Sequence, residues 1–211
     1  MVDCCFVDND IILKLSAGNV FWEAIASVGL EKDRLRVLAT AQYVFRGRKA
    51  TQNYPAAIRE RAIAIVQQCQ VVSSVDVQDS ALYDQLSRGV FQEIDPGEAL
   101  LLTLAPENLS YWLISGDKRC LELLSQAPEL AELKARWQGR VICLEQLMLR
   151  LIDVQGFEWV RDRVLPVRDY DMTLKACFGS GDLATELNVR QALEAYIQDV
   201  RNRAHDLLVD L

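Results

Sequence analysis

The stretch FVDNDIILKL, residues 6–15, combines an apolar run with three consecutive polar residues. Four of its ten residues are Val, Ile or Phe, which favour strands, yet Asp8, Asn9 and Asp10 interrupt them. Burying an unpaired carboxylate is costly, so these groups are expected to cap a helix, bind a ligand or reach water. We therefore expect a first strand over residues 4–7, with acidic side chains directly after it.

Short apolar runs alternate with longer amphipathic stretches over about the first 150 residues. Alternation of strands and helices is typical of an α/β protein with a mainly parallel sheet. We therefore predict a three-layer α/β/α sandwich over residues 1–150. The expected strands are 4–7, 71–75, 111–115 and 141–144, and the expected helices include 20–28, 35–45, 56–68, 80–88 and 97–105.

Residues 151–211 are expected to form a helical C-terminal extension, because the strand pattern fades after residue 150. Residues 165–166 and 177–182 have the composition of loops. Apolar residues recur at spacings of three and four from residue 189 to residue 211, which predicts one long final helix. Asn188 and Gln191 are a candidate capping pair at its start.

The composition is that of a globular protein, with 51% hydrophobic and 25% charged residues and a net charge of −7. Six cysteines without a CxxC pair, together with a single histidine, argue against a zinc site. No apolar run approaches the roughly 18 residues that cross a bilayer, and no basic segment precedes an apolar run at the N-terminus. We therefore expect a cytoplasmic protein with reduced thiols and no membrane partner.

One segment departs from the acidic average. Residues 32–61 contain eight basic and two acidic residues, a net charge of +6. A basic patch on an acidic protein is a candidate landing site for a polyanion. A solvated helix face explains the same pattern equally well.

Three acids fall where a strand ends or a helix begins. Asp8 follows the first strand, Glu98 lies in DPGEALLLTLA (95–105), and Asp117 lies in WLISGDKRCLELL (112–124). Taken singly, each has a structural explanation: DPGE is a capping-box pattern, and Asp117 is a candidate N-cap. Because the carboxyl ends of parallel strands open onto one edge, the three carboxylates are also expected to meet there. Their repulsion would be tolerable around a divalent cation.

In this order and spacing, FVDNDIILKL, IDPGEALLLTLA and LISGDKRCLELL resemble the motifs of the PIN-domain nucleases over about residues 3–150. The resemblance implies a metal-dependent endoribonuclease in which Asp8, Glu98 and Asp117 hold Mg²⁺ or Mn²⁺. RNA is then the expected substrate, and a protein inhibitor, as in toxin–antitoxin pairs, or a second copy of the chain is a candidate partner. Active members often place a fourth acid a few residues after the third, whereas residues 118–121 here are Lys, Arg, Cys and Leu. Asp10 is a candidate substitute, and Glu122 is a weaker one.

Within this hypothesis, Asp8 and Asp117 bind the ion directly and Glu98 binds it or positions the attacking water. Hard oxygen ligands suit Mg²⁺, which explains the use of carboxylates. Further candidates stand around these acids: Asp10 as a metal ligand, Ser115 and Asn9 as supporting groups, and Lys14, Arg46, Arg48 and Lys49 as contacts to RNA.

Two other functions fit parts of the sequence. An apolar strand followed by Asp-x-Asp resembles the first motif of haloacid-dehalogenase-like phosphatases, with Asp8 as nucleophile and Asp10 as general acid. In that hypothesis Ser73 or Ser74 binds phosphate and Asp117 holds the metal, but DPGEA has no role. A PIN-like scaffold or RNA-binding module without catalysis is the third hypothesis, which the missing fourth acid favours.

Overall fold

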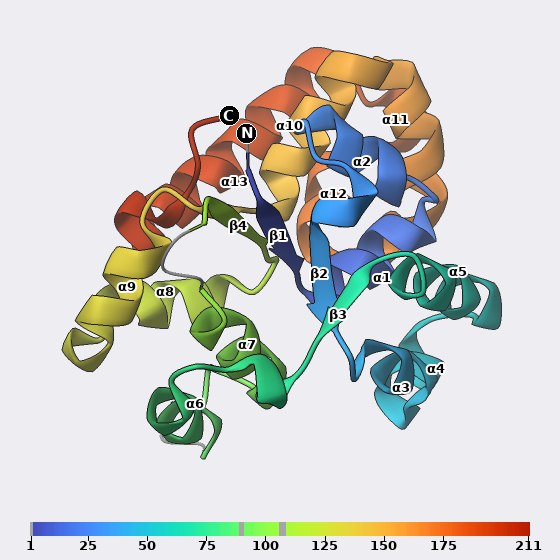
Figure 1. The fold of residues 1–211 in the computed structure, drawn as a ribbon. Helices are drawn as coiled ribbons and strands as arrows, with labels where there is room; N and C mark the ends of the chain where they lie inside the picture. The colour runs from blue at the N-terminus through green and yellow to red at the C-terminus, as the bar shows by residue number, and fades with distance from the viewer. Residues whose placement is uncertain (1, 89–90, 106–108) are drawn as a thin grey trace.

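A parallel five-stranded sheet lies at the centre of the molecule in the computed structural model, which describes residues 2–88, 91–105 and 109–211 (Figure 1). The strand order is β3-β2-β1-β4-β5, and every pairing within it is parallel. The prediction of an α/β sandwich with a mainly parallel sheet is thereby confirmed. The strands are β1 (Cys4–Val7), β2 (Leu35–Leu38), β3 (Gln70–Val72), β4 (Tyr111–Ile114) and β5 (Val141–Ile142).

Helices fill most of the rest of the described chain. They are α1 (Asn9–Ala17), α2 (Phe21–Ser27), α3 (Ala41–Arg46), α4 (Arg48–Asn53), α5 (Ala56–Val66), α6 (Ser80–Ser87), α7 (Pro96–Thr103), α8 (Lys118–Gln126), α9 (Ala131–Trp137), α10 (Leu144–Gln155), α11 (Phe157–Val164), α12 (Met172–Cys177) and α13 (Glu186–Ala204). None of the described helices is both long and apolar enough to cross a membrane.

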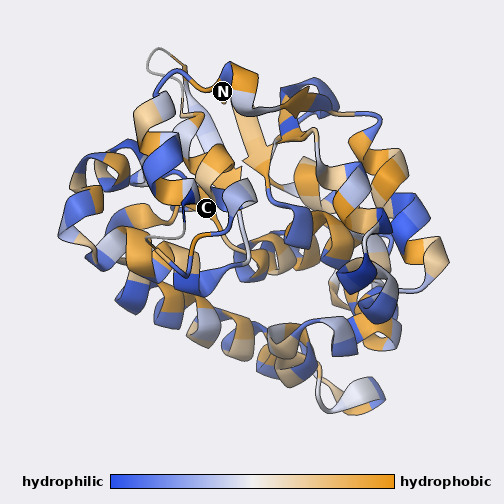
Figure 2. Ribbon diagram, turned by 90° about the horizontal axis from the view of Figure 1, so that it is seen from below, coloured by the Kyte–Doolittle hydropathy of each residue, from blue (hydrophilic) through white to orange (hydrophobic). Residues whose placement is uncertain are grey.

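The helices cover both faces of the sheet. α1, α2 and α5 lie on one side, and α7, α8 and α9 lie on the other (Figure 1). On the second side the rings of Phe6 and Trp137 meet edge to face at 6.2 Å, and the Trp137 indole N–H donates to the carbonyl oxygen of Leu102 at 3.0 Å. The strands are mainly hydrophobic and the helices carry both kinds of residue, as Figure 2 shows. The helices bury their apolar sides against the sheet or against one another, as α6 does on α7 and α13 does on α8.

The prediction of one helix over residues 35–45 was wrong. Residues 35–38 form β2, which lies between β1 and β3, and helix α3 begins only at Ala41. The bend between them falls on Ala39 and Thr40, so neither Gly nor Pro marks the boundary. The apolar spacing of the helix therefore runs into the strand without interruption.

The C-terminal extension packs on the sheet domain, and its last helix is shorter than predicted. α13 ends at Ala204 instead of continuing to residue 211, and Thr185 caps its start instead of Asn188. The final residues turn back to the sheet, where the Val209 N–H donates to the carbonyl oxygen of Val141 at 2.8 Å. Buried side chains of this region, such as Val160, Phe178 and Leu193, belong to the same hydrophobic core as those of the sheet.

The register of the strands places three chain segments at one level. Val7 pairs with Val37 on one side and with Ile114 on the other, so β1, β2 and β4 end together. The residues that follow these strands therefore meet at the carboxyl edge of the sheet, where ligands of open α/β sheets bind.

Candidate active site

Asp8 stands at the junction between β1 and α1. Its backbone N–H donates to the carbonyl oxygen of Ile114 at 3.0 Å, which extends the strand pairing by one residue. Its backbone is extended at φ −69° and ψ 147°, and its side chain does not cap α1. The carboxyl group is nevertheless only 9% exposed. The sequence left three roles open for this acid: capping a helix, binding a ligand or reaching water. The structure excludes the first, because the Asp8 side chain caps no helix.

Glu98 lies in the first turn of α7, where the predicted capping box is confirmed. Asp95 Oδ1 accepts from the N–H groups of Gly97 and Glu98 at 2.7 and 2.8 Å, and Glu98 Oε2 accepts from the Asp95 N–H at 2.8 Å. Gly97 permits this helix to approach β2 closely, because a Cβ there would lie 3.0 Å from Leu38 Cδ1. Glu98 is 8% exposed, and its Oε1 atom is not used by the cap.

Asp117 caps α8, as the sequence also predicted. Its Oδ1 atom accepts from the N–H groups of Arg119 and Cys120 at 2.9 and 3.1 Å, and its own N–H donates to Ser115 Oγ at 3.2 Å. The remaining oxygen, Oδ2, lies 3.4 Å from a terminal nitrogen of the exposed Arg119 side chain. Asp117 Oδ2 therefore takes no part in the cap, and its ion-pair partner, the exposed Arg119 side chain, is free to move into solvent.

The three carboxylates gather at the carboxyl edge. Asp8 and Glu98 line a common cavity of about 10 Å³ with Ser115 and Cys120, which is the room that one water-sized sphere needs. The pKa of Asp8 is raised to about 7, chiefly by burial and further by the charges of Asp10, Asp95 and Asp117, although a hydrogen bond from the Asn9 backbone lowers it.

Glu98 responds to the same surroundings. Its pKa is raised to about 8, chiefly by burial and also by repulsion from the charges of Asp95, Asp117 and Asp8. The hydrogen bond from the Asp95 backbone N–H acts in the opposite direction and lowers the pKa. No ion pair among the described residues involves Asp8 or Glu98. When Asp8 and Glu98 ionise, their negative charge is therefore not compensated by an ion pair within the described chain.

This donor set fits a hard divalent cation. Carboxylate and hydroxyl oxygens are the ligands that Mg²⁺ and Mn²⁺ prefer, and Asp8, Glu98, Asp117 and Ser115 supply them. In their present rotamers, no three His, Cys, Asp or Glu groups of the described chain are placed to hold one ion. Two of the three acids use an oxygen as a helix cap, so an ion would draw on Asp8 and on the free oxygens of Glu98 and Asp117.

The supporting residues proposed from the sequence differ in their positions. Asp10 pairs with Lys14 at 2.5 Å, and a Cβ at Gly116 would lie 3.2 Å from its Oδ2 atom, so only glycine fits there without displacing a neighbour. Asn9 Oδ1 is buried and accepts no hydrogen bond from the described residues. Ser115 is buried beside the cavity.

Glu122, the weaker candidate for the fourth acid, lies away from the cavity lining, with Oε2 3.7 Å from Arg203. Of the four residues after Asp117, Cys120 and Leu121 line the cavity, and Cys120 is the polar one. The position that faces the acids therefore carries a thiol in place of a carboxylate. Burial, together with the charges of the acids, raises the pKa of this thiol well above its ordinary value.

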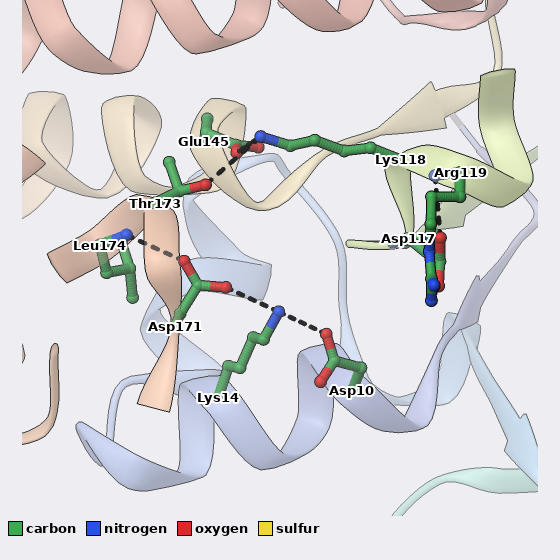
Figure 3. A network of polar contacts seen from close by, with 10 residues as sticks. Asp10, Lys14, Asp117, Lys118, Arg119, Glu145, Asp171, Thr173 and Leu174 are labelled. Atoms are coloured by element: carbon green, nitrogen blue, oxygen red, sulfur yellow. Dashed lines mark hydrogen bonds and ion pairs between the residues drawn. The ribbon is translucent and has the colours of Figure 1, made fainter. Parts of the chain in front are cut away.

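The four basic residues proposed as RNA contacts fall into two groups. Arg46, Arg48 and Lys49 are exposed on α3 and α4, which follow the carboxyl end of β2, and none of the ion pairs of the described chain involves them. The side chain of Lys14, in contrast, is 13% exposed and pairs with both Asp10 and Asp171 (Figure 3). The first group can reach a ligand in solvent, whereas Lys14 is an internal cation.

A second ion pair beside the site, between Lys118 and Glu145, was not predicted from the sequence. Lys118 reaches Glu145 Oε1 on α10 at 2.7 Å and Thr173 Oγ1 on α12 at 3.3 Å (Figure 3). Glu145 interrupts the apolar run VICLEQLML, residues 141–149, which is the signal that drew attention to Asp8. Asp171 gives a weaker signal, as an acid three residues before the apolar Leu174, at the N-cap position of a helix.

Comparisons with models of protein families, with curated proteins and with solved structures found no match for this chain.

Proposed function

We propose that this protein is a metal-dependent ribonuclease that hydrolyses RNA phosphodiester bonds at the carboxyl edge of its sheet. The observation that carries the proposal is that Asp8 and Glu98 line one small buried cavity and that Asp117, about a hundred positions from Asp8, is near enough for its charge to raise the pKa of both. Bringing such acids together costs free energy that either bound protons or a bound cation must offset, and a divalent cation offsets it while all the acids stay ionised. The resemblance of their motifs to PIN-domain nucleases supports the same assignment.

Each acid has a role that follows from its position. A divalent cation held here would lower the pKa of a bound water and neutralise charge that builds on the scissile phosphate. Asp8, which caps nothing, contributes its carboxylate directly, and Asp117 contributes the oxygen outside its cap. Glu98 holds the ion or accepts a proton from the attacking water. Ser115 and Asn9 orient these groups.

The topology disfavours the phosphatase hypothesis. Ser73 follows β3, and β2 separates that strand from β1, so Ser73 is two strands away from Asp8. Asp76 also accepts from the Ser73 N–H at 2.8 Å in a local capping box. A phosphate held by Ser73 would therefore not lie against an Asp8 nucleophile. Asp10, the general acid of that hypothesis, pairs with Lys14.

Cleavage of single-stranded RNA is the direct test. We expect an end-labelled oligoribonucleotide to be cut in the presence of Mn²⁺ and to remain intact in EDTA. An aryl phosphate offered in parallel should not be hydrolysed. Turnover of the aryl phosphate without RNA cleavage would favour the phosphatase, and failure of both reactions with bound RNA would favour the non-catalytic module.

RNA is expected to bind over α3 and α4. Exchanging Arg48 and Lys49 for glutamate should weaken binding of single-stranded RNA about tenfold and flatten its dependence on salt, because fewer phosphates are then neutralised. Fluorescence anisotropy in EDTA measures this binding without cleavage.

Arg201→Glu is the matched control for this exchange. Arg201 pairs with Asp210 near the C-terminus, and Figure 1 places both termini together at the amino edge of the sheet. Equal losses in the two charge-reversed proteins would show that total charge, and not this surface, governs RNA binding.

The remaining proposals concern cell compartment and partners. All six cysteines are free and five of them are buried, which is typical of proteins in a reducing compartment such as the cytoplasm. A protein inhibitor that covers the acidic edge, or a second copy of the chain, is the proposed protein partner.

A further inference from the structure

Two partly buried lysines, Lys14 and Lys118, flank the acidic site, and each is held by a carboxylate from the C-terminal half of the chain. The Lys14 ammonium lies 2.5 Å from Asp10 Oδ2 and 2.7 Å from Asp171 Oδ2. The Lys118 ammonium lies 2.7 Å from Glu145 Oε1, whose side chain is only 3% exposed. Figure 3 shows the Lys118 side chain directed away from Asp117, although the two residues are adjacent in the chain.

Both lysines are close enough to the site to interfere with it. Lys14 Nζ lies 3.6 Å from the position of a Cβ at Gly116, the residue between Ser115 and Asp117. Lys118 is the first residue of the helix that Asp117 caps. A released ammonium on either long, flexible side chain could therefore turn to the carboxylates and occupy the place of a metal ion.

Apart from Asp10, which lies two residues after Asp8, the carboxylates that hold the lysines come from outside the three segments that carry the acids. Asp171 caps α12 by accepting from the Leu174 N–H with Oδ1 at 2.8 Å, and it pairs with Lys14 through Oδ2. Its two oxygens are therefore both fixed. Tyr170, next to it, stacks on Tyr54 with ring centres 5.0 Å apart, which joins this segment to the end of α4.

The ion pairs of Lys14 and Lys118 are shielded from solvent, which favours their remaining formed. Burial alone would lower the pKa of Lys14, but the charges of Asp10 and Asp171 raise it overall, so the lysine stays charged. A buried charge that loses its partner is costly and seeks another carboxylate. Without Asp171, the carboxylate that remains to Lys14 is Asp10, two residues after Asp8. Without Glu145, Lys118 is the residue next to Asp117 in the chain.

We propose that Asp171 and Glu145 are positioning residues that hold Lys14 and Lys118 away from Asp8, Glu98 and Asp117, so that these acids stay available to a divalent cation. This inference rests on the proposed function, because it concerns the same cation site. It makes the C-terminal extension, through Asp171, part of what determines metal affinity.

Asp171→Asn in the full chain tests the inference, since asparagine keeps the cap of α12 and loses only the charge. We expect Mn²⁺ to bind about tenfold more weakly, with free Mn²⁺ counted by electron paramagnetic resonance. In the Asp171→Asn/Lys14→Met double variant, which has no ammonium to release, we expect affinity at least equal to that of the parent. The two substitutions would then have non-additive effects on Mn²⁺ affinity. This distinguishes competition by the Lys14 ammonium from a general loss of negative charge near the site.

Asp169→Asn is the matched control, because Asp169 lies in the same segment and pairs at 2.9 Å with the exposed Lys175. Its Mn²⁺ affinity should stay within about twofold of the parent, as expected for an exposed, screened charge. The Glu145→Gln variant and the Glu145→Gln/Lys118→Met double variant repeat the comparison at the second lysine. The double variant is expected to fold more readily than the single one, because it leaves no unpaired charge behind.

Three results would overturn the inference. Unchanged Mn²⁺ affinity in Asp171→Asn would show that Lys14 does not compete for the site. An equal loss with and without Lys14 would show that Asp171 acts only as a distant charge. A parent protein that binds no Mn²⁺ would overturn the inference together with the proposed function, whereas the first two results leave that function standing.

Discussion

Replacement of Asp8 by asparagine should reduce Mn²⁺-dependent RNA cleavage by at least about a thousandfold. Asp8 is buried, lines the cavity and caps no helix, so the substitution removes a charged ligand and little else. Loss of one electrostatic stabiliser in a water-poor site costs a factor of about 10² to 10³, and weaker metal binding adds to that loss. Single-turnover cleavage of a labelled oligoribonucleotide at saturating Mn²⁺ measures the effect.

Asp117→Asn extends this test to the second acid. Asparagine is as good an N-cap as aspartate, so α8 should persist while the charge is lost. We expect a similar drop in cleavage with an unchanged far-ultraviolet circular dichroism spectrum. Asp182→Asn, at an exposed position of the extension, should cleave at the rate of the parent. Full activity in either site variant would remove that residue from the reaction.

The predictable part of the fold rests on local patterns. β1 is a fully buried apolar run bounded by polar residues on both sides, and such a run is identified by composition alone. The two caps at Asp95 and Asp117 depend only on neighbours within three residues, so they too are visible in the sequence. β2 escaped prediction because a four-residue strand and the helix after it share one continuous apolar spacing.

Parallel topology explains why the position of the acidic site could be predicted. The carboxyl ends of β1 and β4 are adjacent, so Asp8 and Asp117 are brought together by strand order rather than by any contact between them. The partners of Lys14 and Lys118 could not be predicted in this way. Asp171 lies more than 150 positions from Lys14, in a segment whose local pattern gives no register relative to the sheet. The end of α13 at Ala204 has a similar cause, because the last residues pair with the distant β5.

The stability of the protein without metal should fall as the pH rises from about 5 to about 8. The pKa of Asp8 rises from 3.8 to about 7 and that of Glu98 rises from 4.5 to about 8, mainly because both are buried. Between the lower and upper values the folded protein keeps protons that the unfolded chain has released. The folded state therefore binds more protons, and the free energy of unfolding decreases with pH across this window. Below about pH 4 and above about pH 8 these groups add no slope.

For Asp8 alone, the rise of its pKa corresponds to roughly 4 kcal/mol lost between pH 4 and pH 8, of which about 3 kcal/mol falls between pH 5 and pH 8. Urea unfolding, followed by the fluorescence of the four tryptophans at a series of pH values, measures the loss. Saturating Mn²⁺ at pH 8 should restore much of the stability, because the ion binds the folded state and takes over the role of the protons.

Asp8→Asn separates this effect from other titrations. The variant has no carboxyl group to ionise at this position, so its free energy of unfolding should be about 2 kcal/mol or more above that of the parent at pH 8 and close to it at pH 5. Mn²⁺ should stabilise it far less than it stabilises the parent. Asp182→Asn should keep the full slope of the parent. A parent whose stability is constant or increases between pH 5 and pH 8 would mean that Asp8 and Glu98 are ionised and satisfied without a cation. The acids would then be structural groups, and the reason for a metal at this edge would be lost.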